Sequence, residues 1–227
     1  MLQERLNQIN EKIKKVQNQN PQLKPATIIA VSKKQDIEKI KEAYGLGIDN
    51  FGENYWQEAK EKIEALKDLN ITWHYIGRLQ SKKIKEIVGK VQSIHSVSRL
   101  EEIEKINEIA KEKNINQRIL LQVNIANEPT KQGFTPEDLK KVTKNLKDYK
   151  NIKAEGLMIF PPLSEQKEET KKWYQTSQDL FNSIKEDQNP KTWQKLSMGT
   201  SSDFDLAYSM GATDLRIGEA LLGKRTN

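Results

Sequence analysis

The sequence predicts an α/β protein, a (β/α)8 TIM barrel preceded by an extra helix. Eight short apolar, β-prone runs alternate with charged stretches of helical periodicity. Such alternation is typical of a parallel sheet with helices outside it, and 227 residues are close to the ~250 that eight units take. A doubly wound open sheet usually has fewer strands and a Gly-rich turn after the first one, where this chain has Ser32-Lys33-Lys34.

The elements follow in regular order, and we expect residues 1–227 to form a single domain. A helix over residues 3–17 comes first. The expected strands are Thr27–Ser32, Asn50–Gly52, Thr72–Gly77, Ser93–Val97, Arg118–Ile125, Lys153–Phe160, Lys195–Gly199 and Thr213–Gly218. Between them, apolar residues recur at helical spacing, as in Ile37 and Ile40. Ser98 and Thr135 are expected to cap helices, the latter because Pro136 follows at the first helical position.

Composition excludes several classes of protein. The absence of cysteine excludes disulfides and thiolate metal sites, and two histidines are too few for a histidine-rich metal cluster. The net charge is +6, but acidic and basic residues are interspersed, which argues against a nucleic-acid partner. No apolar run approaches the ~20 residues that cross a bilayer, and residues 1–6 lack the apolar core of a signal peptide. We therefore expect a cytoplasmic protein with no membrane partner.

Lys33 is the most informative candidate functional residue. It follows an apolar run at the carboxyl end of the first expected strand, where α/β folds place their ligands. If the alternation of the strand continues, Ile29, Val31 and Lys33 share one face, while Lys34 lies on the other. A lysine half-buried against apolar walls loses hydration, so its pKa falls and its amine becomes nucleophilic, as in a Schiff-base lysine. The alternative is a surface lysine just past a strand end.

Polar residues also follow the other strands, and a barrel brings such strand ends together at its mouth. In chain order they are Lys33, Asn54, His74, Ser96, Asn124, Met158, Ser197 with Ser201, and Arg216. Each has a structural alternative. His74 would be a hydrogen-bonded core imidazole, Asn124 would satisfy strand-end backbone groups, and Arg216 would pair with Asp214.

The turn that leaves the seventh strand is rich in glycine and hydroxyl groups. It comprises Ser197, Met198, Gly199, Thr200 and Ser201, and it enters an expected helix over Asp203–Met210. Free N–H groups and a positive helix end favour an anion there, although an ordinary capped helix start would have the same pattern. Many barrels hold a phosphate between the loops after strands seven and eight, and Gly218 would allow close backbone approach.

A lysine and a phosphate site across one barrel mouth match one ligand, pyridoxal 5′-phosphate, which joins an aldehyde to a phosphate. Arg216 would then meet the pyridine nitrogen. An arginine facing a neutral pyridine leaves a weak electron sink, which would support carbanion chemistry poorly.

These motifs, in this order, closely resemble the pyridoxal phosphate homeostasis proteins, the YggS/PROSC family. The matching segments are Val31–Lys33, Phe51–Tyr55 with Gln57 and Glu58, Trp73–Gly77 with Leu79–Ser81 and Lys83, His95–Val97, Gln122–Asn124, Gly156–Met158, Leu196–Gly199 with Ser201 and Asp203, and Arg216–Gly218 with Gly223. The chain departs from the family at Thr200, where methionine is usual, and in the loops Lys131–Gly133 and Phe160–Pro162. None of these departures affects Lys33 or Arg216.

The resemblance implies a fold like the N-terminal barrel of alanine racemase, with pyridoxal phosphate bound covalently to Lys33 as a Schiff base. It also implies phosphate contacts from the Ser197–Ser201 turn and Gly218, and it places Arg216 near the pyridine nitrogen. The implied role is vitamin B6 homeostasis: the protein holds the cofactor and buffers it or delivers it to apo-enzymes, without significant catalysis. We expect a monomer.

The alternative function is that of a pyridoxal phosphate-dependent amino-acid racemase. Alanine racemases add a β-domain that supplies a tyrosine base from the partner subunit, whereas only four residues follow Gly223 here, Lys224-Arg225-Thr226-Asn227. We therefore expect a non-catalytic protein, with room for a weak racemase-type side activity.

Overall fold

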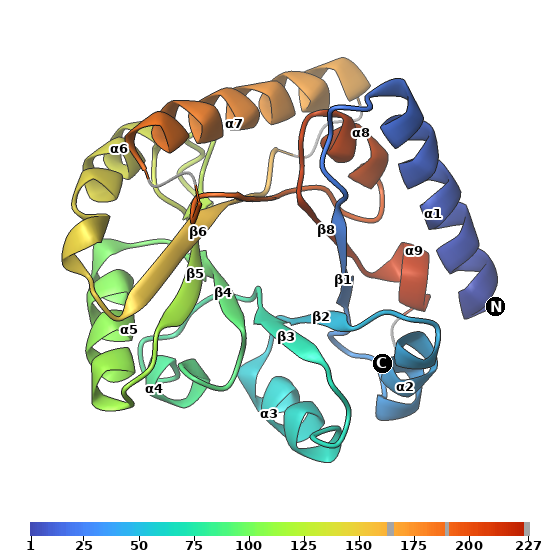
Figure 1. Cartoon of the computed structure of the whole chain (residues 1–227), viewed down its shortest axis with the longest axis horizontal. Coiled ribbons are helices and arrows are strands. Elements are labelled where there is room, and N and C mark those ends of the chain that lie inside the picture. The colour runs from blue at the N-terminus through green and yellow to red at the C-terminus, as the bar shows by residue number, and fades with distance from the viewer. Residues whose placement is uncertain (163–165, 189–190, 225–227) are drawn as a thin grey trace.

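The computed structural model describes residues 1–162, 166–188 and 191–224, and its strands form a closed parallel barrel (Figure 1). Each strand pairs with the next in the sequence, and β8 pairs with β1 to close the ring. The strands are β1 (Thr27–Val31), β2 (Asn50–Glu53), β3 (Thr72–Tyr75), β4 (Ser93–Val97), β5 (Gln117–Val123), β6 (Ile152–Ile159), β7 (Lys195–Ser197) and β8 (Asp214–Ile217). The predicted (β/α)8 barrel is confirmed.

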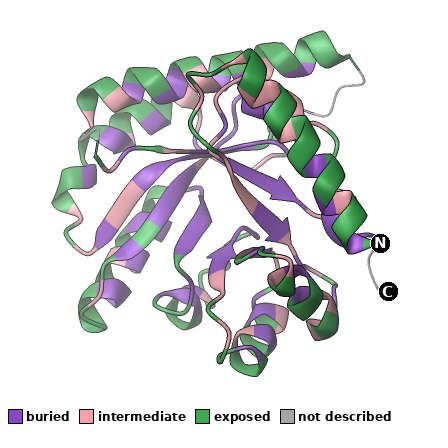
Figure 2. Cartoon of the chain, turned by 45° about the vertical axis from the view of Figure 1, so that its right-hand side comes forward, coloured by how far each residue is buried: buried purple, intermediate pink, exposed green. Residues whose placement is uncertain are grey.

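Helices surround the barrel, and their exposed residues lie on the side away from it (Figure 2). They are α1 (Leu2–Gln19), α2 (Ile37–Gly45), α3 (Trp56–Ala65), α4 (Ile84–Ile87), α5 (Leu100–Glu112), α6 (Pro136–Lys144), α7 (Lys167–Asp187), α8 (Phe204–Ser209) and α9 (Glu219–Leu222), with a 3-10 turn at Leu146–Asp148. The expected extra helix is α1, which packs beside α8 and α9 through the buried side chains of Leu2, Leu6 and Ile9 (Figure 1). None of the helices in the described ranges is long and apolar enough to cross a membrane.

Successive strand residues alternate between the barrel interior and the layer under the helices. A Cβ on Gly52 would lie 3.0 Å from the side chains of both Ile29 and Ile76, so these three positions share the interior. Ala30 and Phe51 have the opposite parity and are fully buried beneath the helices. In β1, the alternating positions that face the barrel interior therefore include Ile29 and lead, past the end of the strand, to Lys33.

The ends of several elements differ from the predicted ones. β7 ends at Ser197 because Gly199 adopts φ +87°, which turns the chain out of the strand. The expected cap at Ser98 is wrong by one residue, since the N-cap position of α5 is Arg99, whose side chain makes no capping hydrogen bond, and Ser98 donates its N–H and hydroxyl to Glu102 Oε2. The cap at Thr135 is confirmed, because its side chain accepts the N–H of Asp138.

Two expectations concern the C-terminal part of the chain. The helix expected over Asp203–Met210 is α8, Phe204–Ser209, with Asp203 at its N-cap. Of the tail that follows Gly223, residues 225–227 lie outside the described residues.

Candidate functional site

A cavity of about 350 Å³ opens at the carboxyl ends of the strands, next to β1 and β8. Its volume lies within the range of small-molecule sites. Six of the predicted site residues line it: Lys33, Asn54, Thr200, Ser201, Arg216 and Gly218. Its other lining residues, none of them predicted as site residues, are Val31, Ile76, Phe160, Ser202 and Glu219. Most of these residues lie just after a strand or continue the alternation that faces the barrel interior. This position along the chain is the sequence signal that could have identified them.

The side chains of Lys33 and Lys34 lie in different environments, as the alternation along the strand predicts. Lys33 is half-buried and lines the cavity together with Val31. Lys34 is exposed and adopts the left-handed φ of +57°, which is uncommon for a residue with a Cβ. Its N–H donates to Glu58 Oε1 over 2.6 Å, on the outer side of the barrel. The amine that faces the cavity is therefore that of Lys33.

Arg216 places a buried cation at the floor of the cavity. Its Nη1 donates to Ser197 Oγ over 2.7 Å and its Nη2 to the carbonyl oxygen of Ile159 over 2.8 Å, while its Nε has no partner. The ring of Phe160 covers the guanidinium, with the ring centre 4.2 Å from Cζ. Burial lowers the pKa of Arg216 to about 10, so the group stays positive at neutral pH.

Among the described residues, no acid forms a salt bridge with this cation. Asp214, the partner considered for it above, pairs instead with Lys195 Nζ at 3.0 Å. A buried arginine without a carboxylate partner suits a ligand that carries negative charge or a hydrogen-bond acceptor.

The hydroxyl-rich turn after β7 also lines the cavity, and hydrogen bonds hold it in place. Asp203 Oδ1 accepts both the N–H and the hydroxyl of Thr200, over 2.7 and 3.0 Å, and its Oδ2 accepts the hydroxyl of Tyr174 over 2.7 Å. Ser201 Oγ accepts the N–H groups of Gly218 and Ala220, each over 3.1 Å. The turn and the start of α9 are thus joined, and Ser201 acts as a cap as well as a lining residue.

The remaining members of the predicted turn support it from within the protein. Ser197 and Met198 are fully buried, the former as the acceptor for Arg216. The carbonyl oxygen of Gly199 accepts the N–H of Arg216, and a Cβ at Gly199 would lie 2.5 Å from that of Ala207. These residues shape the turn and do not line the cavity.

His74 lies deeper in the barrel than predicted. Its Nε2 is 2.8 Å from Oδ1 of Asn50, at the amino-terminal end of β2, and its ring packs edge-on against His95 with centres 5.0 Å apart. Burial lowers the pKa of His74 to about 4 and that of His95 well below its ordinary value, so both rings are neutral. The structure therefore favours the alternative considered for His74, a hydrogen-bonded core imidazole.

The other strand-end residues organise loops around the mouth. Ser96 Oγ donates to the carbonyl oxygen of Gly77 over 2.5 Å. Asn124 exchanges hydrogen bonds with the backbone of Glu128, accepting the N–H over 3.0 Å and donating to the carbonyl over 2.7 Å. Met158 is fully buried. Asn54 reaches the cavity itself, where its buried Oδ1 has no partner in the protein.

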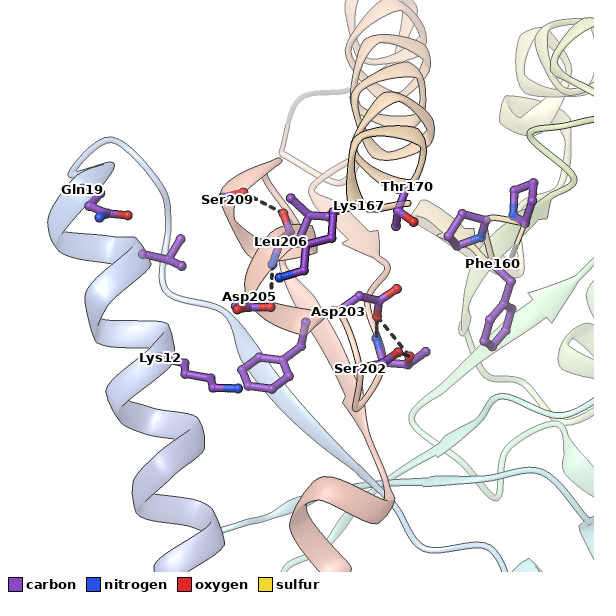
Figure 3. Close-up of a pocket in the computed structure, with 15 residues that line it drawn as sticks. Lys12, Gln19, Phe160, Lys167, Thr170, Ser202, Asp203, Asp205, Leu206 and Ser209 are labelled. Carbon is purple, nitrogen blue, oxygen red and sulfur yellow. Dashed lines mark hydrogen bonds between the residues drawn. The ribbon is translucent and has the colours of Figure 1, made fainter. Parts of the chain in front are cut away.

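A second and larger cavity, of about 630 Å³, lies beside the first, between α1, α8 and the start of α7 (Figure 3). It shares Phe160, Thr200 and Ser202 with the Lys33 cavity. Its walls carry Lys12 and Lys167 together with Asp203 and Asp205, so the charges of its lining are mixed (Figure 3). The smaller cavity, which is lined by both Lys33 and Arg216, is the candidate site.

Comparisons with known proteins agree with this geometry. The family model of the alanine racemase N-terminal domain matches residues 5–226. A pyridoxal phosphate homeostasis protein of Aquifex aeolicus is 39% identical over 223 residues, which cover 98% of this chain and 97% of that protein. The chain belongs to the family of pyridoxal phosphate homeostasis proteins. The resemblance carried by the strand-end motifs is thereby confirmed.

Solved structures show the same fold. PipY of Synechococcus elongatus, in a structure with PLP bound, superimposes with a TM-score of 0.86 at 34% identity and covers 98% of this chain and 100% of its own. Alanine racemase of Clostridium difficile superimposes with a TM-score of 0.75 at 19% identity. This chain corresponds to 56% of that racemase, and the likeness concerns the fold alone.

Proposed function

We propose that this protein binds pyridoxal 5′-phosphate as a Schiff base on Lys33 and buffers or delivers the cofactor in vitamin B6 homeostasis. The observation that carries the proposal is one cavity shared by a half-buried lysine at the end of β1, a buried arginine without a carboxylate partner on β8, and the hydroxyl-rich turn between β7 and α8. The PLP-bound PipY structure and the names of the homologues support it.

The residues fit the separate groups of this cofactor. The amine of Lys33, in its unprotonated form, would hold the aldehyde through a C=N bond, and the aldehyde oxygen would leave as water with the two amine protons. Ser201 and Ser202 offer hydroxyl donors to the phosphate, whereas the hydroxyl of Thr200 and the N–H of Gly218 already donate within the protein. The guanidinium of Arg216, which lines the cavity, would meet the pyridine nitrogen.

Borohydride reduction of the loaded protein followed by peptide mapping tests the attachment site. The pyridoxyl group is expected on Lys33, with trapping lost in Lys33→Ala and kept in Lys34→Ala, the matched neighbour. Recovery of the label on Lys34 would refute the assignment. Pyridoxal, which lacks the phosphate, is expected to bind far more weakly, and equal affinities for the two would refute the phosphate site.

We also propose that the protein lacks significant catalysis, because racemisation needs an acid and a base on opposite faces of the substrate. Tyr75 is a poor candidate for the second base: its hydroxyl donates to the carbonyl oxygens of Asn54 and Arg78, and burial raises its pKa to about 12. Tyr55 is half exposed, at 52%, and does not line the cavity. Turnover in a solvent-deuterium exchange assay with L-amino acids at ~1 s⁻¹ or above, lost in Lys33→Ala, would instead support the racemase alternative.

As a carrier, the protein would act as a cytoplasmic monomer that passes the cofactor to apo-enzymes. Mixing loaded protein with an apo-form of a pyridoxal phosphate enzyme tests delivery. Activation faster than with an equal concentration of free cofactor supports it, and activation no faster than with free cofactor contradicts it.

A further inference from the structure

A buried charge cluster lies directly behind Lys33, on the outer side of β1 and β2. Its members are Glu53 of β2, with 1% of its surface exposed, and Lys62 and Glu58 of α3; Lys62 is 4% exposed. Lys62 Nζ donates to Glu53 Oε1 over 2.8 Å and to Glu58 Oε1 over 2.5 Å. None of these three side chains lines the cavity.

The cluster forms hydrogen bonds to the backbone on both sides of Lys33. On one side, Lys62 Nζ donates to the carbonyl oxygen of Ser32 over 2.6 Å, and Ser32 Oγ donates to Glu53 Oε1 over 2.6 Å. On the other side, Glu58 Oε1 accepts the N–H of Lys34 over 2.6 Å. Both carboxylates and the backbone carbonyl thus converge on one ammonium group.

The segment held by these hydrogen bonds, Ser32–Gln35, is a strained turn. The N–H of Gln35 donates to the carbonyl oxygen of Ser32 over 3.0 Å, so Lys33 and Lys34 are its two central residues. Lys34 adopts φ +57°, a conformation that persists in a residue with a Cβ only where the surroundings impose it. Here the surroundings are the hydrogen bonds to Glu58 and Lys62, which hold the peptide groups that flank Lys33.

Stability alone does not explain a buried ion pair at this place. Moving two charges out of water costs about as much as their attraction returns, and apolar side chains of similar volume are often as stabilising. Desolvation raises the pKa of Glu53 in spite of the neighbouring Lys62, which shows how strongly the cluster is removed from solvent. What an ion pair provides and an apolar pair does not is directed hydrogen bonds to the backbone of the turn.

We propose that Lys62, acting with Glu53 and Glu58, is a positioning residue that holds the Ser32–Gln35 turn so that the Lys33 amine points into the cavity. The inference rests on the proposed function, since it assigns a role in forming the bond between Lys33 and the cofactor. Lys62 itself touches neither the cavity nor the cofactor.

The test compares Lys62→Met and Glu58→Leu with Lys113→Met. Lys113 is a matched control because its Nζ also donates to backbone carbonyls, those of Lys85 and Val88, at a site remote from Lys33. Two quantities are measured on folded protein titrated with pyridoxal 5′-phosphate: the Kd, and the fraction of bound cofactor that borohydride traps on Lys33 at saturation. A merely structural role would reduce the amount of folded protein but leave the trapped fraction unchanged.

Lys62→Met is expected to raise the Kd about tenfold, or about 1.4 kcal/mol, and to lower the trapped fraction, while Lys113→Met matches the parent. If Lys62→Met does not fold, Glu58→Leu decides by the same two readouts, because Glu58 is partly exposed. Parental values in the folded variants would overturn the positioning role. Failure of the parent itself to form a Lys33 adduct would instead overturn the proposed function.

Discussion

Acidification is expected to destabilise the folded protein through the two histidines inside the barrel. Burial lowers the pKa of His74 from the ordinary 6.5 to about 4, and that of His95 in the same direction. A group whose pKa is depressed by folding binds protons more readily in the unfolded chain, so the free energy of unfolding falls as the pH falls below 6.5. For His74 alone the loss is about 2 kcal/mol at pH 5 and about 3 kcal/mol below pH 4.

The assay is urea unfolding of the protein at pH 7.5, 6 and 5, with the free energy extrapolated to water. In His74→Gln, a side-chain amide replaces the ring as a donor to Asn50, and the loss between pH 7.5 and 5 is expected to shrink by about 2 kcal/mol. Glu53 acts in the opposite sense, because desolvation raises its pKa, but its effect cancels when parent and variant are compared. A variant with the same pH dependence as the parent would refute this reasoning.

Three further outcomes are expected from substitutions. Gly77→Ala should lower the free energy of unfolding in urea by about 2–3 kcal/mol, because the new Cβ would lie 1.8 Å from the carbonyl oxygen of Asn54. Gly45→Ala, whose Cβ would have nothing within 4 Å, should be neutral or stabilising, and equal effects of the two substitutions would contradict this. Ser201→Ala should lose about 1–2 kcal/mol of stability, since two N–H groups lose their acceptor, and should weaken cofactor binding in an absorbance titration; unchanged values for both would contradict the cap. Arg216→Glu should favour protonation of the bound pyridine and shift the absorbance spectrum, and an unchanged spectrum at full occupancy would argue against contact with the ring.

Periodicity along the chain predicted most of the fold and the faces of the strands. The separation of Lys33 from Lys34 followed from alternation together with the family motif, and Lys33 does line the cavity with Val31. The same argument placed His74 in the interior correctly but at the wrong depth. Parity specifies the face of a strand, whereas the direction of the ring along the barrel axis depends on Asn50, a residue of another strand.

Contacts between distant segments account for what the sequence could not predict. The Gly- and hydroxyl-rich turn was recognised, but the engagement of Ser201 by the N–H groups of Gly218 and Ala220 depends on how α9 is placed. Likewise, Lys62 is one of many lysines on charged helices, and only the packing of α3 against β1 and β2 shows that it is buried beside Glu53.

The closure of β8 on β1 has a consequence for the order of events during synthesis. The Lys33 side of the cavity is translated before the Arg216 side, and Gln35 Nε2 joins the two by donating to the carbonyl oxygen of Gly223, 188 positions away. Contacts of such sequence separation form only after the intervening chain has left the ribosome. Nascent chains that end before β8 therefore contain Lys33 without the rest of its cavity. Binding of the cofactor would then indicate that the barrel is complete.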